Sequence, residues 1–343
     1  MRDYMHLAKW EFYKLMKLPL AKILLGILVV IMIGITASEF IAYREDIAYT
    51  ESNPQAPDEM NNMMIEREKF LLTQAQSYEE DPYYTPIQKE AIRRRIAIAE
   101  YKIEHNLVRG IYKDMWYFFS DNMFKWVSLI VTLFAGIVGA FCLAGEYSQR
   151  TLTPMLLLPY KRKKILTAKY MATFMYAALS LGIIIVLGIL SGMIVYGFKG
   201  AGSSVVLYGA SGPYAMATGV YSLLVVCFKI VEIIVMVFIA FMIAALSKSS
   251  ALATIITALT LGILMPLSLF AASYDDIWQY TPFLSWDFRK FLEFGSVMPS
   301  VENFFQNNVA ANVGPMLAGI IVVAYCTLFG AITFYVFCKK DMK

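Results

Sequence analysis

The sequence predicts an all-α, polytopic membrane protein with six transmembrane helices. Of its 343 residues, 59% are hydrophobic and only 16% are charged, whereas soluble domains carry about 25% charged residues. Six stretches are apolar over the roughly 20 residues that a helix needs to cross a bilayer. The Lys and Arg residues gather in alternate loops between these stretches, which is typical of multi-pass membrane proteins.

The six expected spans are Leu20–Ser38, Met123–Leu143, Tyr170–Tyr196, Tyr221–Leu246, Ala251–Phe270 and Pro315–Phe337. We assign residues 20–40 to the first transmembrane helix and residues 123–343 to the other five with their loops. Pro266 should kink the fifth span. Small residues in spans two and three allow close helix contact, either within the chain or at a dimer seam. They are Gly136, Gly139, Ala140, Gly188 and Gly192.

Basic residues predict that both termini are cytoplasmic, in agreement with an even number of spans. The first 17 residues carry four of them, and the 145–170 loop carries six. The stretches 41–122 and 271–313 hold more acids than bases and are expected outside the cell. The 271–313 stretch is too interrupted to span, so short external helices are expected there. The multi-pass protein is assigned to the cell membrane, and a bacterial origin is expected.

Residues 1–19 are expected to form a cytoplasmic helix that lies in the membrane surface. On a helical wheel, one face is apolar and carries Tyr4, Met5, Ala8, Phe12, Leu15 and Met16. The other face carries Arg2, Asp3, Lys9, Glu11, Lys14 and Lys17. A charged lead-in to the first span is the alternative, but it would not require so clean a division.

The 41–122 insert is interpreted as a helical extracellular domain. Residues 60–76 are helix-like, and a second helix should begin with Thr85 as N-cap and Pro86 in the first turn. Residues 93–95 are three arginines in a row. They favour a solvated face with ion pairs to Glu90 and Glu100 over binding of lipid or nucleic acid. The insert contains no nucleophile and base that would make it an enzyme.

Residues 145–169 interrupt two long apolar stretches with "GEYSQRTLTPMLLLPYKRKKILTAK". A short apolar helix should run from Thr151 and end at Pro159, followed by basic residues that face anionic headgroups. Leucines on the cytoplasmic side would leave an apolar patch in water unless a partner covers them. On these grounds alone, a loop resting on headgroups and a helix docked on a partner are equally acceptable.

This segment resembles the loop after the second span of ABC-2 type transporter permeases. The residues that carry the resemblance are Glu146, Thr151, Leu152, Leu156, Pro159, Arg162 and Lys169. Arg150 departs from the pattern, since glycine usually stands there. The resemblance implies that 145–160 is a coupling helix that docks on a cytoplasmic ABC ATPase, and that two ATPase copies drive a pair of identical or related permeases.

The resemblance also implies that the chain itself is a transport subunit and not an enzyme. No G-x-x-x-x-G-K-[ST] phosphate-binding loop occurs in the sequence, so ATP and Mg²⁺ would be bound by the partner. We predict no catalytic, cofactor-binding or metal-binding residues in this chain, and membrane lipid but no nucleic acid as a further partner.

Lys229 and Glu232 interrupt the fourth span. Intramembrane charges often mark function. However, Lys229 should lie about 25 Å from the inner boundary at 1.5 Å per residue, near the outer headgroups, where it can snorkel. We expect a structural i,i+3 pair in preference to a substrate path.

The expected function is ATP-driven export of an amphipathic or hydrophobic substrate, such as a peptide antibiotic, a lipid or a drug. The alternative is a membrane-anchored sensor or assembly protein whose 41–122 domain binds an external ligand without transport.

Overall fold

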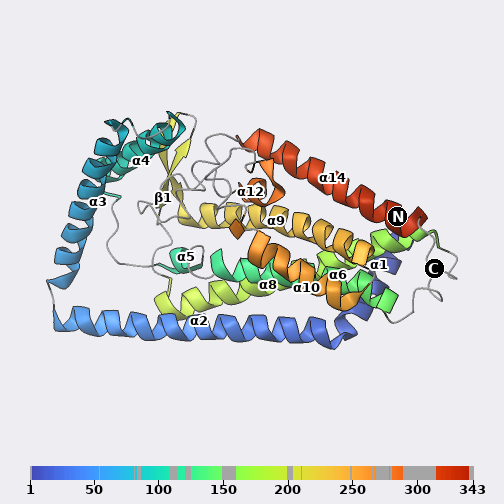
Figure 1. Ribbon diagram of the computed structural model, residues 1–343. Helices are drawn as coiled ribbons and strands as arrows, with labels where there is room; N and C mark the ends of the chain where they lie inside the picture. The colour runs from blue at the N-terminus through green and yellow to red at the C-terminus, as the bar shows by residue number, and fades with distance from the viewer. Residues whose placement is uncertain are drawn as a thin grey trace.

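The computed structural model is an elongated bundle of apolar helices with a smaller module at one end (Figure 1). Both chain termini lie at the opposite end (Figure 1). The structure describes residues 2–53, 55–80, 82, 86–107, 114–119, 125–148, 160–198, 204–209, 211–247, 249–264, 266–267, 278, 280–288 and 314–339.

Within the residues that the structure describes, five helices are long and apolar enough to cross a membrane. They are α2 (Pro19–Ser52), α6 (Lys125–Ser148), α8 (Arg162–Tyr196), α9 (Thr218–Ser247) and α14 (Pro315–Lys339). These correspond to predicted spans one, two, three, four and six, and they confirm an all-α polytopic membrane protein. The first spanning helix, α2, does not end at residue 40 but continues for another 12 residues to Ser52.

The fifth predicted span changes its helical form along its length. Its described part begins with α10 (Ser250–Leu259), which is followed directly by a π-helix, η2 (Thr260–Leu264). Proline has no backbone N–H, and its ring clashes with the carbonyl four residues earlier, which here is that of Gly262. We attribute the widened turn before Pro266 to this clash.

Helix α6 lies at the centre of the bundle, packed against α8, α9 and α10. Glycines on α6 make these approaches possible: a Cβ at Gly136 would lie 2.9 Å from Met236 Cε, and one at Gly139 would lie 3.1 Å from Thr173 Cγ2. Both glycines therefore serve packing within the chain, which is the simpler of the two roles expected for them.

Gly192 on α8 gives a direct test of this packing. A Cβ there would lie 3.0 Å from the backbone oxygen of Met115, in the short helix α5 (Met115–Tyr117). We expect Gly192→Ala to destabilise the protein by about 1–3 kcal/mol, because a backbone atom cannot rotate away. Gly182→Ala on the same helix is the control, since a Cβ at Gly182 meets nothing within 4 Å. Equal thermal unfolding temperatures for the two variants would contradict the prediction.

The first helix, α1 (Arg2–Lys17), crosses the end of the bundle and packs on α8. Leu18 separates α1 from α2 in an extended conformation (φ −66°, ψ 131°). This conformation is the one that a following proline imposes on its neighbour, and Pro19 is well placed in the first turn of α2. The chain therefore bends sharply at a position that the sequence dictates.

The smaller module, which we call the insert module, combines two distant parts of the chain. Its helices are α3 (Ala56–Glu80) and α4 (Pro86–Glu104), and its strands are β1 (Ser204–Gly209) and β2 (Gly212–Ala217). The strands form an antiparallel hairpin in which Gly209 pairs with Gly212. Gly212 has φ +114°, a conformation that favours glycine. Helix α4 packs on the hairpin through Ile98 and Val206.

The arginines of α4 have partners that the sequence did not indicate. Arg93 pairs with Glu79 on α3 at 2.7 Å. Arg94 lies 5.6 Å from the ring centroid of Tyr208 on β1. Burial lowers the pKa of Arg95 from its ordinary value. These side chains link α4 to α3 and to the hairpin, while the Arg93 side chain remains 62% exposed. Thr85, the expected N-cap, lies outside the described residues, and α4 begins at Pro86 as predicted.

Most of the predicted 271–313 external segment lies outside the described residues. Within it, the structure describes one short helix, α12 (Pro282–Ser285), which packs against α14. Trp286 follows directly and is fully buried. The described part of this segment is therefore folded against the bundle.

Candidate functional site

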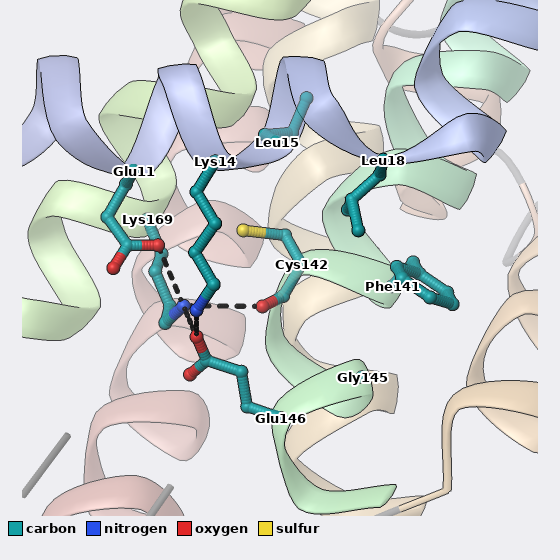
Figure 2. Close-up of a pocket in the computed structure, with 9 residues that line it drawn as sticks. All are labelled: Glu11, Lys14, Leu15, Leu18, Phe141, Cys142, Gly145, Glu146 and Lys169. Carbon is teal, nitrogen blue, oxygen red and sulfur yellow. Dashed lines mark hydrogen bonds and ion pairs between the residues drawn. The ribbon is translucent and has the colours of Figure 1, made fainter. Parts of the chain in front are cut away.

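Four charged side chains from three helices meet at the end of the bundle that holds α1 (Figure 2). Glu146 comes from the last turn of α6, Lys169 from α8, and Glu11 and Lys14 from α1. We call these four residues the charge cluster. Lys169 lies at its centre, with Nζ 2.7 Å from Glu146 Oε1 and 3.0 Å from Glu11 Oε2. Lys14 Nζ reaches the same Glu146 oxygen at 2.5 Å.

The helix geometry explains why these groups converge. Glu11 lies between Ala8 and Leu15 at spacings of three and four, so all three share one face of α1. That face packs on α8, which buries Leu7, Ala8 and Leu15. Lys169 in turn donates to the backbone oxygen of Cys142 on α6 at 3.4 Å. The cluster therefore joins α1, α6 and α8 at one point.

The charges in the cluster balance, with two lysines against two carboxylates. Three of the four groups are buried, with relative exposures of 0% for Lys169, 1% for Glu11 and 4% for Glu146. Lys14 is the exception, with a side-chain exposure of 42%. Removing charges from water is costly unless each finds a partner of opposite sign. Balance is thus a condition for burying this cluster at all.

A small cavity adjoins the cluster, with a volume of about 30 Å³. It is lined by the four charged residues and by Leu15, Leu18, Phe141, Cys142 and Gly145 (Figure 2). One oxygen of each carboxylate, Glu11 Oε1 and Glu146 Oε2, is buried and has no hydrogen-bond partner within the described part of the chain. A water molecule fits a cavity of this size and would supply the missing donor.

The cluster brings together two of the seven predicted coupling residues, Glu146 and Lys169. Arg162, the first residue of α8, donates instead to the Cys338 carbonyl oxygen on α14 at 3.5 Å. The remaining four, Thr151, Leu152, Leu156 and Pro159, lie outside the described residues. These four residues stand between α6, which ends at Ser148, and α8, which begins at Arg162. The charge cluster contains a residue from each of these two helices and so links them.

Sequence reasoning missed Glu11 and Lys14 as partners in this cluster. It placed both on the polar face of the first helix, whereas Glu11 is buried inside the protein. The predicted apolar face is also divided, since Ala8 and Leu15 are buried but Met5 remains 52% exposed. The sequence did contain a signal, because Glu11 stands three residues after Ala8 and four residues before Leu15, and these two small or apolar residues lie on the buried side.

The second predicted constellation is also present. Lys229 Nζ forms an ion pair with Glu232 Oε2 within α9, so the i,i+3 pairing is confirmed. The expected snorkelling is wrong, because Lys229 is 0% exposed and lies inside the protein. Burial of the entire pair raises the energetic cost of losing either partner.

Among the residues that the structure describes, no group of three or more His, Cys, Asp or Glu side chains is arranged to hold a metal ion. The four cysteines are unpaired thiols. The described chemistry is therefore that of packed helices and buried ion pairs.

Comparison with known proteins gives a match over nearly the whole chain. Residues 5–342 match the family model described as "ABC-2 family transporter protein". The chain is also 21% identical over 313 residues to "Uncharacterized protein YhcI" of Bacillus subtilis (strain 168), with 91% of this chain and 92% of that protein covered. No solved structure is significantly similar to the chain.

Proposed function

Because the chain belongs to the ABC-2 transporter family, a family of membrane transport components that work with an ABC ATPase, we propose that it is the permease subunit of an ATP-driven exporter. Two copies of a separate cytoplasmic ATPase would bind ATP and Mg²⁺, and a second permease, identical or related, would complete the transport path. Both termini and residues 145–169 would face the cytoplasm, with the insert module outside.

The charge cluster is the observation that carries this proposal. The coupling segment, residues 145–160, would receive the movement of the ATPase. Since α6 and α8 flank this segment and are tied by Glu146 and Lys169, a displacement of the segment would move both helices together. Glu11 and Lys14 extend the tie to α1. The cluster would thereby pass ATP-driven motion from one loop into three helices.

We propose an amphipathic or hydrophobic substrate such as a peptide antibiotic, a lipid or a drug. Support comes from the broad apolar surface of the helices, including exposed Ile33, Val186 and Leu223, along which such a molecule would be accessible from the membrane. Lipid is a further expected partner for the same reason.

The test is co-purification with candidate ATPases. We expect Leu152→Asp to abolish the complex, because a carboxylate would have to be desolvated in an apolar docking contact. Arg162→Glu should weaken it at least as much, with some loss of stability because Arg162 also contacts α14. Lys163→Glu is the matched control, since Lys163 is exposed and stands outside the residues that carry the resemblance. Retention of the ATPase by the Leu152→Asp variant would contradict the proposed docking.

A further inference from the structure

The outward face of α3 carries four exposed residues in a continuous row. Glu59, Met63, Glu66 and Phe70 follow one another at spacings of four, three and four, which puts them on one side of a helix. Met63 is 61% exposed and Phe70 is 66% exposed, and both glutamates are exposed as well. We call these four residues the outer stripe.

The opposite face of α3 is the one that the fold uses. Glu79 pairs with Arg93 and Glu68 pairs with Lys102, both on α4. Leu72 is half-buried on the same side. The insert module is thus held together without the outer stripe, which leaves two large apolar side chains in water with no role in packing.

The position of α3 excludes the lipid tails as the cover for this stripe. Helix α2 has 34 residues and is therefore about 51 Å long at 1.5 Å per residue, against about 30 Å for the hydrocarbon core of a bilayer. Helix α3 stands across the far end of α2, away from the bundle (Figure 1). The outer stripe consequently faces water beyond the headgroups.

Charge identifies the kind of molecule that would fit. Helix α3 carries six acidic and two basic residues, and Glu59 and Glu66 of the stripe are exposed, so this face attracts cations. Met63 and Phe70 are seven residues apart, and each has a glutamate four residues earlier in the chain. This arrangement matches a helix whose own apolar row is flanked by Lys or Arg. In the described part of the insert module, Arg93 and Arg94 of α4 already face Glu79 and Tyr208, so a separate peptide fits the outer stripe better than α4 of a second copy.

We propose that the outer stripe of α3 is a docking surface for a cationic amphipathic helical peptide. Met63 and Phe70 pack against the apolar row of the peptide, and Glu59 and Glu66 pair with its basic residues. The surface rests on the proposed external placement of the module. It gives that module a role as the first point of contact for a peptide ligand.

The test uses the full chain in nanodiscs of zwitterionic lipid and a fluorescent synthetic helix of leucine and lysine as the probe. Empty nanodiscs give the background. The same peptide with glutamate in place of lysine is the charge control. We expect the lysine peptide to bind with an affinity that falls as salt is added, and the glutamate peptide not to bind.

Two stripe variants, Glu59→Gln/Glu66→Gln and Met63→Ser/Phe70→Ser, should each weaken binding about tenfold, the loss expected when one or two central contacts are removed. Glu45→Gln/Glu80→Gln removes the same charge from exposed positions outside the stripe and should bind nearly as the unmodified chain does. Equal binding of both peptides, or stripe variants that bind as well as this control, would overturn the proposal. Co-purification of the ATPase reports separately on the proposed function, since the stripe is remote from residues 145–169.

Discussion

Lys169→Met is expected to destabilise the protein by about 3–5 kcal/mol, the cost of removing one partner from a buried ion pair. Methionine fills a similar volume, so the loss is electrostatic. Without the ammonium group, Glu11 loses its 3.0 Å contact and only the half-exposed Lys14 remains to balance two buried carboxylates. Thermal unfolding of the purified protein in nanodiscs measures the effect. Lys163→Met, the same substitution at an exposed position six residues earlier on α8, is the control and should be neutral.

A second variant separates stability from coupling. Lys169→Met/Glu11→Gln restores the charge balance of the cluster and should recover much of the lost stability. It does not restore the tie between α1 and α8, so ATP hydrolysis by the complex should still be reduced. Full stability of the single variant, or full coupled hydrolysis by the double variant, would contradict the role assigned to the cluster.

The sequence predicted the spanning helices well because burial in lipid leaves a strong signal of length and composition. Four predicted spans lie within long helices of the structure, and Met123–Leu143 coincides with α6 from Lys125 onward. The part of the fifth span that the structure describes is helical too, with a change of hydrogen bonding at Thr260 that hydropathy does not reveal. A local rule also succeeded at Pro86, which stands at the start of α4 as predicted.

The features that sequence reasoning missed depend on contacts between distant segments. The β-hairpin is one, because two short strands are marginal alone and these are supported by Ile98 on α4, about 100 residues earlier. Glu11 is another. Its neighbours suggested a polar face, and only Lys169, 158 positions away, explains its burial. The sequence therefore predicted half of the candidate site, because it indicated Glu146 and Lys169 but not α1, which completes the cluster.

Glu232→Leu should have the second-largest effect, a loss of about 3–5 kcal/mol, because it leaves the Lys229 ammonium buried without its carboxylate. The double change Lys229→Leu/Glu232→Leu should be far less harmful, since replacing both members of a buried pair by apolar residues is often neutral or stabilising. Ile230→Leu, at a 45% exposed position of the same helix, controls for substitution in α9. Thermal unfolding and ATP hydrolysis by the purified complex are the two measurements.

The double variant also decides what the pair is for. If Lys229 and Glu232 serve only the packing of the protein, a chain that carries two leucines should fold and couple to ATP hydrolysis as the unmodified chain does. If they take part in a substrate path, the protein should fold normally yet lose transport-linked hydrolysis, because the polar groups that a passing molecule contacts are gone. We expect the first result. The second would assign the pair to the transport path and contradict the structural interpretation.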